Sequence, residues 1–357
     1  MINEVLIKNF KCFEKLIIPE LGRITLIGGR NNIGKTALLE SLFLFLDRYH
    51  SDMILRQYGW RGIEGVLSEP DAMWAPIFHN FDINKEIIIG AVIDGRQQEA
   101  KFKFNPNYRP QIAVLTTPPP NREIPTDEKG STSFSLDIEY TGPDGKKDQL
   151  SHLTIDHMGR LLLNLEHPFR KYPPGVFLAS KKHILSTDTT NWLSSFIREG
   201  RENDIVEFLQ IIEPRLNTLK IVTEGPSSFV HGMLEGAPRT RDIHLMGEGM
   251  EKLLNLILAV AQCKGGCVFL DEFENGLHYS GLAKIWEAIV KLLHKYNCQL
   301  ITTTHSHECL RACFEGLAGY KEDFRYIRLD RKADEITAKL FNYKMISEAI
   351  KTSLEIR

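Results

Sequence analysis

The sequence predicts an α/β fold with a mixed or parallel sheet core, a β-rich insertion and a helical lobe. The first indication is a short buried strand that ends in glycines and leads directly into an apolar helix, over residues 24–46. The second is the alternation of apolar strands and a helix between residues 268 and 303, which is typical of a parallel sheet with covering helices. The third is a period-two pattern over about 85–166, which indicates short strands joined by hairpin turns.

The N-terminal residues predict strands that lead into a glycine turn. Val5 and Ile7 alternate with polar residues, and Ile24 to Ile27 form a short buried run before two glycines. The helix expected over Lys35 to Leu46 is apolar on most faces, so it should be buried.

The middle of the chain is expected to change from strands to helices. Asp94-Gly95 and Met158-Gly159 predict hairpin turns. Residues 116–133 combine four prolines with small and charged side chains and predict a mobile loop. Residues 183–262 are expected to be helical, because apolar residues recur at helical spacing. These residues are Ile205, Phe208, Leu209, Ile212 and Leu216.

The composition excludes several classes of protein. The 357 residues carry a net charge of −2 and 43% apolar residues, so the chain is neither a globally basic nucleic-acid binder nor disordered as a whole. Its longest apolar stretches are far shorter than the roughly 20 residues that cross a bilayer. We therefore expect a cytoplasmic protein with no membrane contact, whose six cysteines are reduced thiols.

Residues 29–36, GRNNIGKT, match the phosphate-loop pattern G-x-x-x-x-G-K-[ST] between a predicted strand and a predicted helix. Glycines let the backbone wrap around an anion, and N–H groups at the helix start donate to phosphate oxygens. Lys35 adds a charge toward the β- and γ-phosphates, and Thr36 would ligate Mg²⁺. The alternative is a glycine-rich structural turn. The residues expected to contact ATP here are Gly29, Asn31, Asn32, Ile33, Gly34, Lys35, Thr36 and Ala37.

Two adjacent carboxylates follow the buried strand at 268–270. Ligands bind at the carboxyl ends of strands in such sheets, so Asp271 can hold Mg²⁺ and Glu272 can act as the general base for water. The alternative is a strand end with two solvated acids.

Two further motifs make a resemblance specific. His305 follows the strand at 300–303, and Gly247, Glu248 and Gly249 open a helix before the Asp271 strand. Together with the phosphate loop and the opening IKNFKCF, this order resembles the ABC-type ATPase head of the RecF, SMC and OLD group. DEFENGLH and the ending LEIR resemble stand-alone OLD-like AAA family ATPases of the bacterial anti-phage type, without a TOPRIM domain.

The resemblance implies ATP and Mg²⁺ as cofactors, and it implies roles for further residues. His305 would contact the γ-phosphate and help position water, Lys11 would contact ATP, and residues 247–249 would cap the nucleotide of the opposite subunit. Two departures stand out. Met246 replaces the usual signature serine, and Ser180, Lys181 and Lys182 stand where the family has a glutamine. Gln57 is a substitute for that glutamine by residue type only.

The resemblance also implies a division of the chain. Residues 1–50 and 263–357 would form the ATP-binding core lobe. Residues 51–180 would form the β-rich insertion with the mobile loop 116–133. Residues 181–262 would form a helical lobe with the signature-like motif.

The leading hypothesis is an ATP-hydrolysing head that closes as a homo-dimer or higher oligomer. Closure would act on DNA or on a separately encoded effector, a nuclease or toxin, in anti-phage defence. The alternatives are a repair or recombination ATPase acting directly on DNA, an OLD-like nuclease and a transporter cassette. A nuclease is disfavoured because 52 residues follow His305 and the chain has no D-x-D pair.

Two side-chain sets allow a second interpretation. His305, His307, Cys309 and Cys313 have zinc-ligand residue types, but a switch histidine followed by a helix with packed cysteines explains them as well. Scattered basic residues are candidates for a nucleic-acid groove or for a solvated surface. They are Arg56, Arg61, Lys181, Lys182, Arg239 and Arg241.

Overall fold

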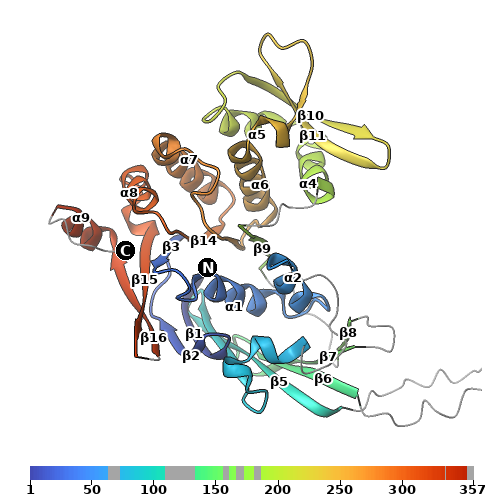
Figure 1. Cartoon of the computed structure of the whole chain (residues 1–357), viewed down its shortest axis with the longest axis vertical. Helices are drawn as coiled ribbons and strands as arrows, with labels where there is room; N and C mark the ends of the chain where they lie inside the picture. The colour runs from blue at the N-terminus through green and yellow to red at the C-terminus, as the bar shows by residue number, and fades with distance from the viewer. Residues whose placement is uncertain are drawn as a thin grey trace, which may run out of the picture.

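The computed structural model describes residues 1–62, 73–108, 133–155, 161–165, 173–180, 186–333 and 335–351. Within them, two large sheets and one small sheet carry the fold (Figure 1). The six-stranded sheet has parallel neighbours except for β16 at its edge. Its order is β16 (Glu335–Asn342), β15 (Phe324–Lys332), β3 (Ile24–Gly29), β14 (Gln299–Thr303), β13 (Cys267–Leu270) and β9 (Gly175–Leu178). The predicted α/β fold with a mixed, largely parallel sheet is therefore confirmed.

The seven-stranded sheet is antiparallel throughout. Its order is β2 (Phe13–Ile18), β1 (Ile2–Phe10), β4 (Ile87–Ile93), β5 (Arg96–Tyr108), β6 (Ser133–Thr141), β7 (Lys147–Ile155) and β8 (Leu161–Leu165). The predicted turn at Asp94-Gly95 joins β4 and β5, and both residues have positive φ. The turn predicted at Met158-Gly159 lies outside the described residues, as do residues 116–132 of the predicted mobile loop.

Helix α1 (Lys35–Asp47) packs between the two large sheets. In Figure 1 it lies with α2 (Met53–Trp60) between strands β5 to β7 and the helices α6 and α7. Its side chains share one core cluster with Ile7 and Ile89 of one sheet and Phe269 and Ile301 of the other. Burial on both sides explains why the helix is apolar on most faces, as the sequence predicts.

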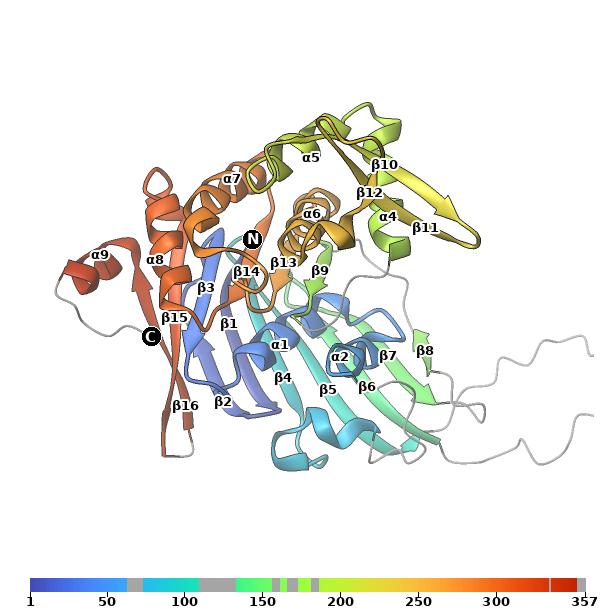
Figure 2. The ribbon, with the colours of Figure 1, turned by 45° about the horizontal axis from the view of Figure 1, so that its top comes forward.

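The opposite face of the six-stranded sheet is covered by α6 (Glu248–Gln262), α7 (Leu282–Lys295) and α8 (His307–Gly316) (Figure 2). Strand residues alternate between the two cores, since Leu26 belongs to this cluster and Ile27 to the cluster around α1. Cys309 and Cys313 of α8 lie in this core as buried free thiols, and all six cysteines are free as predicted. Helix α9 (Tyr343–Lys351) follows β16.

The prediction that residues 183–262 are helical is wrong for part of that stretch. Helices α4 (Ser186–Arg198), α5 (Glu202–Leu209) and α6 are present, but a three-stranded antiparallel sheet lies between them. Its strands are β10 (Leu216–Glu224), β11 (Ser227–Leu234) and β12 (Arg241–Asp242). Pro214 explains the change, because proline disfavours a helical conformation in the residue before it and cannot donate a backbone hydrogen bond. Leu216, which matched the helical spacing, begins β10.

The predicted division of the chain stays a prediction. Strands β1 and β2, predicted to belong to the core lobe, lie in one sheet with the strands of the predicted insertion. Strand β9, at the end of the predicted insertion, lies in the six-stranded sheet. Among the described helices, none is both long enough and apolar enough to cross a bilayer.

Candidate active site

The phosphate loop joins β3 to α1 in a curled conformation. Gly29, Asn32 and Gly34 all have positive φ, and Gly34 immediately precedes the helix. A Cβ atom on Gly34 would lie 2.6 Å from Cys12 Sγ, so a side chain there is excluded both by space and by its φ of 100°. No side chain caps the helix, so N–H groups of its first turn are available to an anion.

Lys35 reaches back across this loop. Its Nζ donates to the backbone oxygens of Gly29, at 2.7 Å, and Arg30, at 2.9 Å. Burial lowers the pKa of Lys35 to about 8, although Asp271 and Glu272 act in the opposite direction. A negatively charged ligand in the loop would favour the charged ammonium, so the site fits the phosphates of a nucleotide.

The residues predicted to hold Mg²⁺ lie together. Thr36 Oγ1 donates to the carboxylate of Asp271, at 3.0 and 3.1 Å, and Thr303 Oγ1 donates to the same carboxylate at 2.7 Å. Burial raises the pKa of Asp271, while these hydroxyl contacts lower it. A hydroxyl and a carboxylate are oxygen donors of the kind that Mg²⁺ prefers, so the residues present fit the ion.

Glu272 and His305 meet at the end of the phosphate loop. His305 Nε2 lies 3.5 Å from Glu272 Oε1, and its Nδ1 lies 2.6 Å from Asn31 Oδ1. Because an amide oxygen only accepts, Nδ1 is the donor in that contact. Asn275 Nδ2 donates to Glu272 Oε2 at 2.5 Å. Glu272 also has a φ of 53°, a conformation that non-glycine residues adopt mainly where the surrounding structure enforces it.

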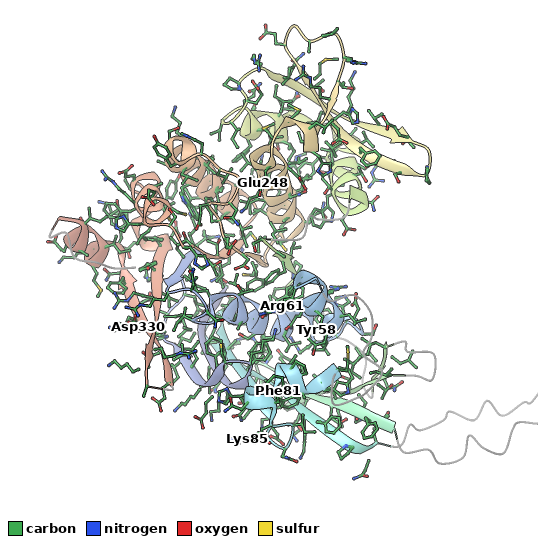
Figure 3. The ribbon with its side chains drawn as sticks, viewed as in Figure 1. Tyr58, Arg61, Phe81, Lys85, Glu248 and Asp330 are labelled. Atoms are coloured by element: carbon green, nitrogen blue, oxygen red, sulfur yellow. The ribbon has the colours of Figure 1, made fainter. Side chains whose placement is uncertain are left out.

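A cavity of about 690 Å³ contains most of the predicted residues. It is lined by Lys11, Asn31, Asn32, Ile33, Gly34, Lys35, Thr36, Ala37, Glu272 and His305. Sequence reasoning missed seven other lining residues, namely Cys12, Tyr58, Arg61, Pro76, Phe78, Asn80 and Phe81, of which the sequence marks Arg61 only as a nucleic-acid candidate. Gly29 lines a neighbouring cavity of about 610 Å³ together with Arg328 and Asp330, and this cavity shares Asn31 and His305 with the first one. Tyr58, Arg61, Phe81 and Asp330 are labelled in Figure 3.

The amine of Lys11 is bound by protein groups. Its Nζ donates to Glu40 Oε2 at 2.7 Å and to Gln57 Oε1 at 3.0 Å. Glu40 is fully buried and also accepts from Arg61 Nε and Nη2, at 2.9 and 2.8 Å. The expected contact of Lys11 with ATP stays a prediction. Gln57, considered above as a substitute for the family's glutamine, accepts a hydrogen bond from Lys11 rather than from Thr36 at the expected Mg²⁺ site.

The signature-like segment does not line the cavity of its own subunit. Gly247 has a φ of 114°, and α6 begins at Glu248 as predicted. Gly249 packs so closely on the loop after β13 that a Cβ atom would lie 2.5 Å from the oxygen of Gly276. Glu248 on α6 and Arg61 on the α1 side are labelled far apart in Figure 3.

Lys252 connects this segment to Glu272. Its Nζ donates to the backbone oxygen of Glu272 at 2.5 Å. Burial lowers the pKa of Lys252 to about 8, and the nearby acids Glu274 and Glu248 oppose that shift. The first two turns of α6 and the loop after β13 are therefore in direct contact within one subunit.

The basic residues considered for nucleic acid come from separate parts of the fold. Arg56 pairs with Asp47 and Asp52, and Arg61 pairs with Glu40. Arg241 lies in β12 of the small sheet. Lys181 and Lys182 lie outside the described residues.

Comparison with known proteins places the chain. A family model described as "AAA domain, putative AbiEii toxin, Type IV TA system" matches residues 24–310. An "ATP/GTP phosphatase" of Helicobacter pylori is 23% identical over 333 residues, which cover 86% of each chain. A probable ATP-dependent transporter of Cyanidium caldarium is 29% identical over 141 residues, 37% of this chain and 50% of that protein.

Among solved structures, the Smc head domain of Pyrococcus furiosus, with an extended coiled coil and bound to the C-terminal domain of ScpA, has the same fold. Its TM-score is 0.50 at 12% identity, and the match covers 99% of each chain. The fold and the matched family model agree with the phosphate-loop geometry. The chain belongs to the AAA family defined by that model and is an ATPase that uses ATP and Mg²⁺.

Proposed function

We propose that this ATPase closes as a homo-dimer or higher oligomer and thereby regulates a separately encoded effector, a nuclease or toxin, in anti-phage defence. In this proposal the chain is a stand-alone ATPase of the OLD-like subtype. One observation supports the closure: Gly247 to Gly249 do not line the cavity of their own subunit, which is the arrangement expected if they cap a nucleotide held by another copy. Lys252 would couple that cap to Glu272.

The proposed hydrolysis uses the residues gathered around the cavity. Lys35 and the N–H groups at the start of α1 bind the phosphates, and Asn31 and His305 orient the γ-phosphate and the water. Glu272 takes the proton from the attacking water. Thr36 and Asp271 would hold Mg²⁺, which when bound neutralises charge on the phosphate oxygens.

Closure is tested by the mass of the protein in solution. Light scattering after size exclusion should show the Glu272→Gln variant as a larger species with ATP and Mg²⁺ than without nucleotide. Lys35→Ala is the control and should not change mass with ATP. An unchanged mass of Glu272→Gln in saturating ATP contradicts the closure.

The separate effector is tested on the pure protein. We expect no cleavage of single- or double-stranded DNA or of RNA with ATP and Mg²⁺ or Mn²⁺. Cleavage that disappears in Lys35→Ala would show that the chain is itself the nuclease. Hydrolysis that DNA alone stimulates would favour the repair ATPase acting directly on DNA.

A further inference from the structure

The wall of the nucleotide cavity formed by residues 76–81 has an unusual conformation. Two short 3₁₀ segments, η1 (Ala75–Ile77) and η2 (His79–Phe81), make this wall. Asn80 and Phe81 both have positive φ, of 52° and 59°. Phe81 is 69% exposed, although its side chain is large and apolar, and it lines the cavity. Strained backbone that presents an apolar ring to a cavity is a typical feature of a binding site.

The surrounding structure holds this wall in place. Lys11 N–H donates to the oxygen of Ile77 at 2.9 Å, and His79 Nδ1 lies 2.9 Å from the oxygen of Lys11. Phe78 is buried and forms a β-bridge with Phe10. The exposed ring of Phe81 is therefore carried by a backbone that is bonded to the turn after β1.

The same turn connects the wall to the phosphate loop. Cys12, next to Lys11, lies against Gly34 at the start of α1. The cavity thus extends from Glu272 and His305, past the start of α1 and Cys12, to Phe81. Glu272 and His305 lie at the reacting end of the triphosphate in the proposed mechanism, so the base of the nucleotide extends toward the other end.

We propose that Phe81 is the surface on which the nucleobase of the bound nucleotide stacks. This assignment rests on the proposed phosphate site at Lys35. Stacking removes the exposed ring from water and gains ring–ring contact, which compensates for the strained backbone. The phenyl ring has no hydrogen-bond donor or acceptor, so Phe81 contributes equally to the binding of ATP and of GTP.

Calorimetry with ATP, GTP and inorganic tripolyphosphate separates the base from the phosphates. Phe81→Ala should weaken ATP and GTP by the same factor, about 5- to 150-fold, the range expected for loss of one base–aromatic stack. Tripolyphosphate binding should stay unchanged, and Phe81→Trp should keep ATP affinity. Phe134→Ala is the matched control, since Phe134 is an exposed ring that packs on Phe104 and does not line the cavity.

A second measurement uses the thiol of Cys12, which lines the cavity while the other five cysteines are buried. Burial raises the pKa of Cys12, so labelling with a maleimide will be slow but selective for this residue. ATP should protect the thiol in the native protein, and more ATP should be needed in Phe81→Ala.

The possible outcomes are distinct. Wild-type ATP affinity in Phe81→Ala overturns the proposal, and so does an equal loss of ATP and tripolyphosphate, because Phe81 would then act through the phosphate loop. If Phe81→Ala does not fold, Phe81→Leu keeps the apolar bulk without the ring and should show the same selective loss. A native protein that binds neither ATP nor tripolyphosphate refutes the proposed phosphate site instead.

Discussion

Replacing Glu40 by glutamine should destabilise the protein by about 3 kcal/mol, the lower end expected when a buried ion pair loses one partner. Glu40 is fully buried on α1, and its Oε2 lies 2.7 Å from Lys11 Nζ. The Lys11 side chain is only 12% exposed, so its ammonium would lose its charged partner and gain little contact with water in return. The Arg61 side chain is 48% exposed and stays in contact with water, so the loss of its pair with Glu40 costs less stability. Urea unfolding followed by circular dichroism measures the change.

The effect should depend on pH. Burial alone would raise the pKa of Glu40, but Lys11 and Arg61 outweigh burial and hold the pKa below the ordinary carboxyl value of 4.5. A carboxyl with a lower pKa in the folded state stabilises the fold fully above 4.5, and this contribution is lost as the pH falls through the folded-state value. The difference in free energy of unfolding between wild type and Glu40→Gln should therefore shrink in acid.

A double-mutant cycle supplies the control. Glu40→Gln combined with Lys11→Met removes both charges and should cost less than the sum of the single variants. The exposed pair Glu287–Lys291, with 54% and 56% of its side chains exposed, should show far weaker coupling, because water screens both charges. Additive costs at Glu40 and Lys11 would refute the argument. So would a Lys11→Met variant of unchanged stability that loses ATP affinity, because the amine would then serve the nucleotide.

Three further substitutions test the site. Lys35→Ala should abolish most ATP binding in calorimetry while the fold survives, and unchanged affinity would contradict the phosphate-loop assignment. Glu272→Gln should keep ATP bound but slow ATP hydrolysis, measured as phosphate produced, by about 10²-fold or more, as expected when a general base is lost. Wild-type turnover would exclude that role. Gly249→Ala should lower ATP hydrolysis with ATP binding retained, because its Cβ forces α6 away from Gly276. Gly319→Ala is the control, since Gly319 also lacks a positive φ but has open space around it, and equal losses in both variants would exclude the clash with Gly276 as the cause.

Sequence reasoning succeeded where the signal is local. The glycine loop, Lys35 and Thr36 lie within one short motif, and Asp271 follows a continuous apolar strand. Parallel strands place their carboxyl ends at one sheet edge, so the strand pattern by itself predicts that these residues meet. The contacts of Thr36 with Asp271 confirm that they do.

The sequence did not reveal the other wall of the cavity. Arg61 is brought to it by its pair with the fully buried Glu40, and Phe81 by the bonds of its wall to the turn after β1, and no motif marks such an arrangement. The small sheet was missed for a different reason. Leu216, Leu219 and Ile221 are separated by the polar residues Asn217, Thr218 and Lys220, and Leu219 and Ile221 have the spacing of a strand. The helical spacing that precedes Pro214 continues as far as Leu216 and obscures this pattern.

The position of β3 in its sheet bears on how the protein is made. This strand, which carries the phosphate loop, hydrogen-bonds only to β14 (Gln299–Thr303) and β15 (Phe324–Lys332) in its sheet. Both partners are translated long after β3, roughly 300 residues later for β15, a delay of about 15 to 60 s at ~5–20 residues per second. A ribosome-bound chain that stops before β14 therefore lacks both strands that flank β3, so the sheet around the phosphate loop can form only after these later strands are made.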